Sequence, residues 1–319
     1  MRFPEATAQR RPQHPRRPSG AGCLCLTVMM PHALERVAVA TVSYNSSAHL
    51  RPFLESLRRG EGPELGVVIA DNGSADLDRT REAAAEFDAT LLELGENRGY
   101  GGAINAAVAA LPDSVEYVLV SNPDVRILPG AVSALVEAFE RYPRAGALGP
   151  RVLNEDGTTY PSARRLPSLR TGVGHALFGT IWPRNPWTRS YREEERGYED
   201  EHVVGWLSGS FVMLRRAAFA DIGGFDEGYF MYFEDVDLGY RLDKHGWTSV
   251  YIPSSSVVHT GAHSTTTESE RMIRAHHDSA YRYLSKKYDR AWLTPLRWVL
   301  RTGLGVRARY LTAKARRAR

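Results

Sequence analysis

Residues 37–47 read VAVATVSYNSS, a run of small and β-branched apolar residues that stops at a polar turn. A continuous apolar run of this length is typical of a strand that is buried on both faces in a parallel sheet. Similar runs follow at residues 65–70, 89–94 and 115–120, and residues with helical periodicity separate them. Strands and helices that alternate over short connections predict an α/β fold with a mixed, mostly parallel central sheet flanked by helices.

The remaining pattern predicts further elements along the chain. Helices are expected within the first half at residues 50–57, 79–87 and 103–111. The second half predicts a strand at 203–214, a short helix at 215–222, a strand at 249–252, a segment at 257–263 that leads into a polar loop, and closing helices at 272–288 and 292–311. Between residues 149 and 204 the periodicity is lost, and prolines and charges indicate a long insertion.

Polar side chains follow the predicted strands at the points where they end, namely Asn45, Asp71, Asn72 and Asp124. In open α/β sheets, ligands bind beyond the carboxyl ends of the strands. Each residue alone could serve a turn, because Asn and Asp bond to nearby backbone there. Four of them in register favour a ligand site at this edge of the sheet.

Residues 228–247 read GYFMYFEDVDLGYRLDKHGW and place three carboxylates, Glu234, Asp235 and Asp237, at the start of a predicted helix. Acidic residues in a first turn are also what ordinary helix capping produces. Arg241 follows Asp237 by four residues, so these two side chains are expected to pair. A carboxylate at a helix N-terminus is expected to stay ionised at neutral pH.

Residues 97–105 read NRGYGGAIN after a predicted strand, which invites comparison with a dinucleotide-binding loop. The spacing excludes that motif, because Ile104 stands where the third glycine is required, and the chain has no P-loop motif. A helix that begins with small residues can present backbone N–H groups to phosphate. Close packing of the helix on its neighbours explains the glycines equally well.

Asp124 ends the fourth predicted strand, and His259 follows a later one. A hard divalent cation that bridges two phosphates needs only one or two protein carboxylates, since substrate and water supply its other ligands. Asp124 could provide one of them, and His259 could add a ligand. The alternatives are a turn at Asp124 and an ordinary polar role for His259. His276 and His277 are expected on the surface.

The net charge of +4 is unevenly distributed along the 319 residues. Residues 286–319 contain eleven Lys or Arg and one Asp, whereas residues 37–285 are acidic overall. A basic tail on an acidic body indicates an anionic partner surface, and the acidic body argues against a nucleic-acid groove across the fold.

The leader, residues 1–35, is rich in Arg and Pro and is expected to be disordered. Cys23 and Cys25 are the only cysteines in the sequence, so the body has no disulfide, which suits a reducing compartment. No apolar run approaches the roughly twenty residues that a membrane span needs.

The motifs VSYN, IADNGS, ENRGYGGAIN, SNPDV, GGFDE and FEDVDLGYRL occur in this order between residues 37 and 263. Together they resemble the inverting family 2 glycosyltransferases, which have the GT-A fold. Within that family the chain is most similar to actinobacterial rhamnosyltransferases that act on polyprenyl-diphosphate-linked N-acetylglucosamine. The ordered set is far more specific than any one of its motifs.

The resemblance implies a role for each matching residue. Nucleotide-sugar binding would involve Tyr44, Asn45, Asp71, Asn72, Asn97, Arg98, Asn105, Asn122 and Asp124. Asp235 matches the general base, Glu234 would orient or contact the acceptor, and the acceptor side would include Trp206, Ser208 and Gly209. Asp124 and His259 would hold Mg²⁺ or Mn²⁺, although Asn122 replaces the first Asp of the family's metal-binding DxD motif.

The implied reaction moves L-rhamnose from dTDP-L-rhamnose onto N-acetylglucosaminyl-diphospho-polyprenol in cell-wall linker synthesis. The implied architecture is a GT-A domain at residues 36–265, with a nucleotide-sugar half (36–125) and an acceptor half (126–265), followed by C-terminal helices at 266–319. The expected location is the cytoplasmic face of the plasma membrane, with peripheral attachment to anionic lipid and no nucleic-acid partner. A homo-oligomer stays open.

The sequence leaves some other functions open and argues against others. Galactofuranosyl or mannosyl transfer and a non-catalytic nucleotide-sugar-binding protein at the membrane surface stay open. A processive membrane synthase is excluded, because it needs a Q-x-x-R-W motif and the only glutamines are Gln9 and Gln13. A sugar-nucleotide pyrophosphorylase would carry a Gly- and Arg-rich loop after its first strand. This chain has SYNSSAHL at that position, which argues against this function.

The last predicted helix carries a leucine stripe, Leu293, Leu296, Leu300 and Leu304, with arginines interspersed. This pattern is typical of a helix that lies in the interface of an anionic membrane. A helix that packs its leucines on the body and leaves a solvated basic end would show the same spacing. The arginines of the insertion, Arg164, Arg165 and Arg170, could meet the diphosphate of the acceptor.

Overall fold

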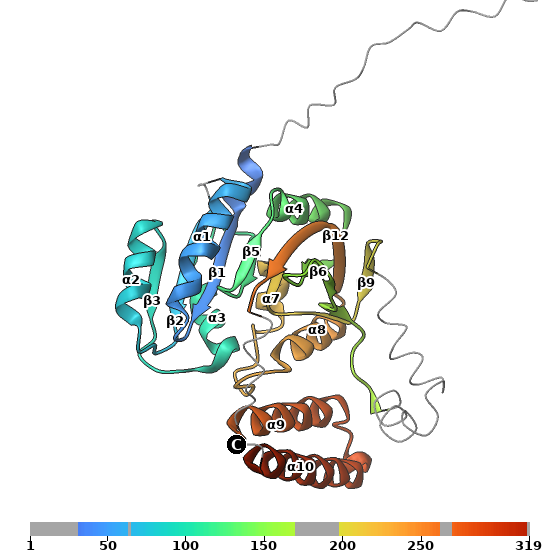
Figure 1. Cartoon of the computed structure of the whole chain (residues 1–319). Helices are drawn as coiled ribbons and strands as arrows, with labels where there is room; N and C mark the ends of the chain where they lie inside the picture. The colour runs from blue at the N-terminus through green and yellow to red at the C-terminus, as the bar shows by residue number, and fades with distance from the viewer. Residues whose placement is uncertain (1–30, 63–64, 170–197, 262–269, 318–319) are drawn as a thin grey trace, which may run out of the picture. The chain divides into compact units, whose positions relative to one another are not determined.

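The structure is a computed structural model that describes residues 31–62, 65–169, 198–261 and 270–317 (Figure 1). Its first half alternates strands and helices as the sequence predicts: β1 (Val37–Ser43), α1 (Ser47–Glu61), β2 (Gly66–Asp71), α2 (Leu77–Glu86), β3 (Thr90–Glu93), α3 (Gly99–Ala109) and β4 (Tyr117–Ser121). The four strands are parallel, in the order β3-β2-β1-β4. Ser43 and Asp71 pair at the carboxyl ends of β1 and β2, so the polar turns meet at one edge.

The second half completes a mixed sheet. It contributes β5 (Val125–Ile127), α4 (Ala131–Arg141), β6 (Ala145–Leu153), β11 (Phe211–Arg215), α7 (Arg216–Asp221) and β12 (Thr248–His259). Over the described residues, the sheet has the order β3-β2-β1-β4-β11-β6-β12-β5, and β11 runs antiparallel to both of its neighbours. Short strands extend it: β7 (Thr159–Tyr160) pairs with β6, and β9 (His202–Val204) pairs with β12.

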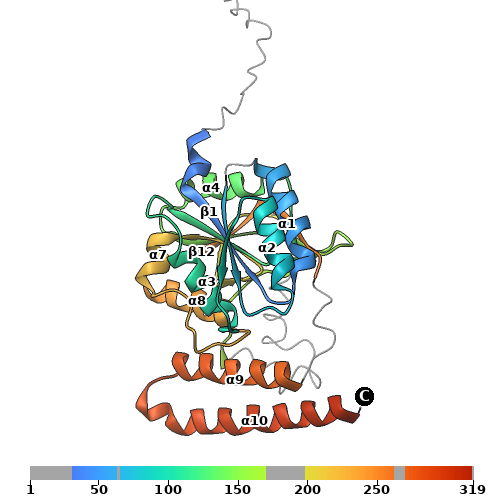
Figure 2. The ribbon, with the colours of Figure 1, turned by 90° about the vertical axis from the view of Figure 1, so that its left-hand side faces the viewer.

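Helices cover both faces of the sheet (Figure 2). One core layer, below α1 and α4, contains the buried side chains of Phe53 and Phe139. The other layer, below α3, α7 and α8 (Glu234–Lys244), contains Ile104, Phe219 and Leu242. The apolar residues of α1 recur every three or four positions because only that spacing keeps them on one buried face.

Two predictions about the second half are corrected. Residues 203–214, expected as one strand, form parts of three, because β10 (Trp206–Leu207) leaves the main sheet to pair with β8 (Ala163–Arg164). Gly205 allows this change, since a Cβ there would collide with the backbone of residues 165–166. Residues 249–252 and 257–263, expected as separate segments, belong in large part to β12, whose register shifts between Ile252 and Ser256.

The C-terminal helices are α9 (Glu270–Lys287) and α10 (Thr294–Arg317), joined by a 3₁₀ turn at Ala291–Leu293. Both figures show them side by side, with α9 next to α8. The leucine stripe of α10 is partly buried, and the exposed large side chains lie elsewhere on the helix, at Trp298, Val299, Val306 and Tyr310. The stripe is therefore the face that packs on the protein, as the second interpretation of this helix expects.

Two smaller predictions also change. Residues 31–36, expected in large part to belong to a disordered leader, form a 3₁₀ helix; the rest of the leader and Arg170 lie outside the described residues. His277, expected on the surface, is buried, and its Nδ1 lies 2.7 Å from the carbonyl oxygen of Ile273. Across the described ranges, no helix is long and apolar enough to cross a membrane.

Candidate active site

Asp71 lies at the end of β2 and is only 1% exposed. Its Oδ1 accepts hydrogen bonds from the backbone N–H groups of Gly73 (3.2 Å) and Ser74 (2.9 Å), which fixes the turn. Its Oδ2 is buried and has no hydrogen-bond partner among the described residues. A buried oxygen without a donor costs about 1–3 kcal/mol. This atom is therefore well suited to accept a hydrogen bond from a ligand.

The turn after β1 lies against the turn after β2. Asn45 has a left-handed backbone (φ 51°), and its Oδ1 accepts a hydrogen bond from the N–H of Ala75 at 2.8 Å. Its own N–H donates to Ser74 Oγ at 3.0 Å. Tyr44 is 47% exposed. Asn45 thus joins the two turns, and Tyr44 borders them with a free aromatic surface.

The amides of Asn72 and Asn97 hold the loop that begins α3. Asn72 Nδ2 donates to Asn97 Oδ1 (3.1 Å) and to the carbonyl of Gly99 (3.2 Å), and Asn72 Oδ1 accepts from the N–H of Arg98 (2.8 Å). The Arg98 side chain is exposed and lies 3.6 Å from Glu96. The two amides shape the loop instead of pointing out of it, whereas Arg98 is accessible to a ligand.

Asn105 is committed to another part of the chain. Its Oδ1 accepts from the N–H of Phe225 (2.8 Å), and its Nδ2 donates to the Phe225 carbonyl (2.9 Å) and to Glu227 (3.0 Å). Gly101 also packs closely on Phe225, because a Cβ at Gly101 would lie 2.8 Å from the Phe225 side chain. The small residues of α3 therefore serve close packing, and Asn105 fastens α3 to the 225–227 loop.

Asp124 and His259 meet as the sequence predicts, with 3.1 Å between Asp124 Oδ1 and His259 Nε2. Burial opposes ionisation of Asp124, but the hydrogen bond and charge of His259 outweigh it and hold the pKa of Asp124 below its usual value. The Asp124 carbonyl accepts from both Thr260 N and Thr260 Oγ1. Asn122 precedes this pair, and its N–H donates to the carbonyl of Ser210.

This pair fits a cation that substrate phosphates help to hold. An ionised carboxylate and an imidazole are two donors, and within the described residues no group of three or more His, Cys, Asp or Glu could form an all-protein site. Mg²⁺ or Mn²⁺ commonly keeps waters and phosphate oxygens as its other ligands. The donor set suits a metal that arrives with a diphosphate.

Glu234 and Asp235 open α8 directly after two left-handed residues, Tyr232 (φ 67°) and Phe233 (φ 66°). Asp235 Oδ2 accepts from the N–H of Gly209 (3.1 Å), and Oδ1 accepts from the N–H of Val236 (2.8 Å). Non-glycine residues rarely adopt positive φ, and each costs about 1–3 kcal/mol. The acidic pair is therefore presented by a strained turn that other contacts must hold.

Those contacts come from α9. Ser279 Oγ donates to the carbonyl of Met231 at 2.9 Å, and the Phe233 ring packs against Tyr283. The third acid, Asp237, is fully buried and pairs with Arg241 (2.6 Å), as the sequence predicts.

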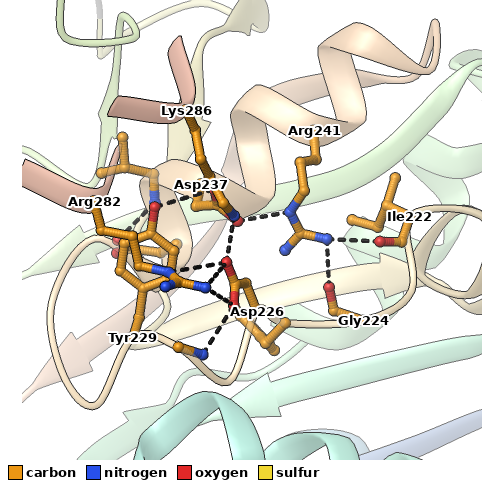
Figure 3. Close-up of polar contacts among 12 residues, drawn as sticks. Ile222, Gly224, Asp226, Tyr229, Asp237, Arg241, Arg282 and Lys286 are labelled. Carbon is orange, nitrogen blue, oxygen red and sulfur yellow. Dashed lines mark hydrogen bonds and ion pairs between the residues drawn. The ribbon is translucent and has the colours of Figure 1, made fainter. Parts of the chain in front are cut away.

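The buried Asp237 also joins α8 to α9 (Figure 3). It accepts a hydrogen bond from Lys286 Nζ at 2.8 Å, and Lys286 contacts Asp226 as well. Arg282 donates to both carboxylate oxygens of Asp226, at 2.8 and 2.9 Å. The start of α8 is thus fixed to α9 by a network of buried and partly buried charges.

Tyr100 links α3 to the acidic pair. It is not among the candidate site residues predicted from the sequence. Its hydroxyl donates to the Gly209 carbonyl at 2.6 Å, and its N–H donates to the Phe230 carbonyl. Burial raises the pKa of this phenol, and the negative charges of Glu234, Asp235 and Asp124 raise it further. All three carboxylates therefore act on one ring. The position of Tyr100 inside the NRGYGGAIN motif is the feature of the sequence that could have identified it as a site residue.

The residues expected on the acceptor side lie around Gly209. Gly209 is buried between Tyr100 and Asp235, and a Cβ there would lie 3.4 Å from the Tyr100 ring. Ser208 Oγ lies 3.0 Å from Ser210 Oγ. The Trp206 indole donates to the Arg165 carbonyl, and the Arg164 guanidinium lies over its ring. These short segments position Asp235 through the backbone of Gly209.

Comparison with known proteins identifies the family. The sequence pattern of glycosyl transferase family 2 matches residues 38–223, and that of glycosyl transferase family group 2 matches residues 199–307. The chain belongs to glycosyl transferase family 2. This glycosyltransferase is 46% identical over 290 residues to the N-acetylglucosaminyl-diphospho-decaprenol L-rhamnosyltransferase of Mycobacterium tuberculosis, a match that covers 88% of this chain and 94% of the relative.

Two further similarities agree with this assignment. The glycosyltransferase is 26% identical over 257 residues to the rhamnosyltransferase WbbL of Escherichia coli K12, covering 79% of this chain and 93% of the relative. Its fold resembles that of the mannosyltransferase PcManGT from Pyrobaculum calidifontis, solved with GDP-Man and Mn²⁺, with a TM-score of 0.53 at 18% identity, covering 89% of this chain and 73% of that one. The predicted GT-A fold is confirmed.

The acidic pair of this glycosyltransferase differs from the ionised carboxylates that were expected. Burial raises the pKa of Glu234 to about 8, and the charge of Asp235 adds to the effect. Burial also raises the pKa of Asp235, against two backbone donors, Gly209 and Val236, that favour its charged form. The expectation of ionised carboxylates came from their place at a helix N-terminus, and it left out the cost of removing each charge from water. Each carboxylate oxygen of Asp235 accepts a backbone N–H, whereas Glu234 Oε2 accepts none among the described residues, so Glu234 is the better placed of the two to hold a proton.

Proposed function

We propose that this glycosyltransferase transfers L-rhamnose from dTDP-L-rhamnose to N-acetylglucosaminyl-diphospho-polyprenol, with inversion at the anomeric carbon. The observation that carries the proposal is the 46% identity to the mycobacterial rhamnosyltransferase, which extends over 94% of that relative. The similarity includes the segment with the acidic pair, because the aligned region covers 88% of this chain. The product would serve cell-wall linker synthesis.

In the proposed reaction, Asp235 is the general base. The acceptor hydroxyl attacks the anomeric carbon of the bound sugar, and Asp235 takes its proton as the new C–O bond forms. The bond between the anomeric carbon and the diphosphate oxygen breaks on the opposite face, and its electron pair leaves with the nucleoside diphosphate. The raised pKa of Asp235 makes it a stronger base than an exposed carboxylate, while the Gly209 and Val236 N–H groups keep it aimed.

The donor would lie along the edge formed by β1, β2 and β4. Asp71 Oδ2 would accept a hydrogen bond from the base or ribose, with Tyr44 and Asn45 beside it. Arg98 is exposed at the start of α3, where it would meet the diphosphate. Asp124 and His259 would hold Mg²⁺ or Mn²⁺, which when bound neutralises charge on the departing diphosphate. Asn122 in place of a carboxylate leaves the cation more dependent on substrate oxygens.

A lipid-linked acceptor requires the enzyme to work at a membrane, and α10 suits that place. Its sequence contains seven Lys or Arg and no acidic residue, and its exposed face carries Trp298, Val299, Val306 and Tyr310. Basic residues beside exposed aromatic and aliphatic side chains are typical of attachment to anionic lipid. Peripheral attachment at the cytoplasmic face, where nucleotide sugars are available, follows from this proposal.

A donor panel tests the reaction. The purified protein is supplied with dTDP-L-rhamnose, UDP-galactofuranose or GDP-mannose, each with N-acetylglucosaminyl-diphospho-polyprenol, with and without Mg²⁺ or Mn²⁺. We expect transfer from dTDP-L-rhamnose alone. The Asp235→Asn variant should lose about 10²–10⁴-fold in kcat and retain donor binding, because only the proton acceptor is removed. Transfer from another donor alone would replace the rhamnose assignment. Binding without transfer would favour the non-catalytic alternative.

A further inference from the structure

A basic groove of about 790 Å³ lies between α9, α10 and the loop before the acidic pair. The residues of interest in its lining are Phe230, Arg271, Arg274, Ser279, Arg282 and Arg316. Two carboxylates, Glu270 and Asp278, also line it, so positive charge predominates. The groove lies outside the donor edge described above, and none of its lining residues has a role in the proposed reaction.

The four arginines of the groove differ in whether they already form an ion pair with a carboxylate. Arg282 is bound to both oxygens of Asp226, and Arg316 is paired with Glu270. Arg271 stacks on Phe230, with its guanidinium carbon 4.7 Å from the ring centroid, and has no ion pair within the described part of the chain. Arg274 is exposed and forms no ion pair or hydrogen bond there. Arg271 and Arg274 are the two guanidinium groups available to an anion.

The groove adjoins the catalytic turn through shared residues. Phe230 lines the groove and accepts, through its carbonyl, the N–H of Tyr100, whose hydroxyl reaches Gly209 beside Asp235. Ser279 lines the groove and bonds to Met231, in the turn that leads to Glu234. One loop, residues 228–233, thus separates a basic groove from Asp235, the carboxylate that would take the proton of the acceptor hydroxyl.

We propose that this groove binds the diphosphate of the lipid-linked acceptor, with Arg271 and Arg274 as its principal ligands; this inference rests on the proposed function. The planar guanidinium group suits phosphate oxygens, because it donates two parallel hydrogen bonds and keeps its charge. The acceptor sugar would then extend across the 228–233 loop toward Asp235. The lipid chain would leave beside α10, where apolar side chains are exposed at Trp298, Val299 and Val306.

The test uses the full-length protein and a soluble acceptor, N-acetylglucosamine linked through diphosphate to a short prenyl chain, with no membrane present. The double variant Arg271→Gln/Arg274→Gln should raise KM for this acceptor at least about tenfold, because it removes both charged donors to the diphosphate. The kcat and the KM for dTDP-L-rhamnose should stay within about twofold. Arg79→Ala, which removes an exposed arginine from α2, serves as the control and should leave all three constants unchanged.

The outcomes separate this inference from the proposed function. If the wild-type protein transfers no rhamnose to the soluble acceptor, the proposed function fails before the variants are compared. If it transfers and the double variant has an unchanged acceptor KM, the groove is not the diphosphate site. A second series adds vesicles that contain 30% phosphatidylglycerol. A defect that occurs only with these vesicles would assign the two arginines to lipid headgroups and overturn the proposal.

Discussion

The raised pKa of Glu234 is the residue-scale feature that most affects the chemistry. Glu234 is 9% exposed, its Oε2 has no hydrogen-bond partner in the described ranges, and burial raises the pKa of its neighbour Asp235 as well. Two adjacent buried carboxylates rarely ionise together, because each charge is desolvated and repels the other. A neutral Glu234 can donate a hydrogen bond to the acceptor, whereas an ionised one can only accept hydrogen bonds.

A pair that holds its single proton on Glu234 predicts a bell-shaped pH profile for kcat. Asp235 must be ionised to act as the base, so kcat should rise with pH through its pKa, which burial places above the ordinary 3.8. Activity should fall again as Glu234 loses its proton at about pH 8. The variant Glu234→Gln keeps a neutral donor, so it should keep the acid limb and lose the alkaline one. The profiles are measured with saturating donor and acceptor.

The control for this profile is Glu82→Gln, which changes an exposed glutamate on α2. It should reproduce both limbs of the wild-type curve. An alkaline limb that persists unchanged in Glu234→Gln would show that another group causes it. A curve without an acid limb above the ordinary range of an aspartate would contradict the raised pKa of Asp235.

At the scale of elements, α9 acts on the reaction through the turn that it holds. Tyr232 and Phe233 are both left-handed, and neither could keep that conformation cheaply without outside support. Ser279 supplies a hydrogen bond to Met231, and Tyr283 packs on Phe233. Helix α9 is therefore part of the support for Asp235, although it contributes no group to the proton transfer.

Removal of the Ser279 hydroxyl should loosen this turn. We expect Ser279→Ala to lower kcat by about 2–10-fold, which corresponds to the loss of one hydrogen bond of about 0.5–1.5 kcal/mol. The KM for the donor should not change, because the Ser279 hydroxyl bonds to Met231 and not to a residue of the donor edge. The matched control is Ser285→Ala on the same helix, since Ser285 Oγ is buried and makes no hydrogen bond within the described residues. Equal effects of the two substitutions would mean that only helix stability is measured.

The sequence predicted the elements whose signal is local and not those that distant contacts determine. The β-branched runs of β1, β2 and β4 identify buried strands, because burial on both faces leaves no polar position. The break between β10 and β11 depends on the partner strand β8, about forty residues earlier in the chain, and so was missed. The left-handed pair Tyr232–Phe233 was equally invisible, since intrinsic preference opposes that conformation and only packing against α9 allows it.

The same distinction applies to the site. Asp71, Asp124, His259 and Asp235 could be predicted because carboxylates and imidazoles at strand ends and helix starts, together with family motifs, indicate chemistry. The raised pKa of Glu234 could not, because desolvation depends on what surrounds the side chain. The internal roles of Asn72 and Asn105 depend on loops up to about 120 residues away, which sequence spacing does not reveal.

At the scale of the whole molecule, charge and apolar surface coincide on α10. The helix has no acidic residue, and its leucine stripe is partly buried, so the side chains left exposed are mostly arginines, aromatics and valines. An acidic body and a basic tail would orient the protein at an anionic surface with α10 toward the lipid. The basic groove would then lie on the side of the molecule from which a lipid-linked acceptor arrives.

Vesicle binding tests this orientation. The protein should co-sediment with vesicles of 30% phosphatidylglycerol, bind more weakly to neutral vesicles, and be released as salt increases, because screening weakens the attraction to the surface. The double variant Trp298→Ser/Val306→Ser should bind at least about tenfold more weakly, since each side chain would lose the burial of its apolar surface in the interface. Val203→Ser on β9 is the matched control, because Val203 and Val306 are both 60% exposed. Equal binding by the wild type and the α10 variant would place the lipid contact on another surface.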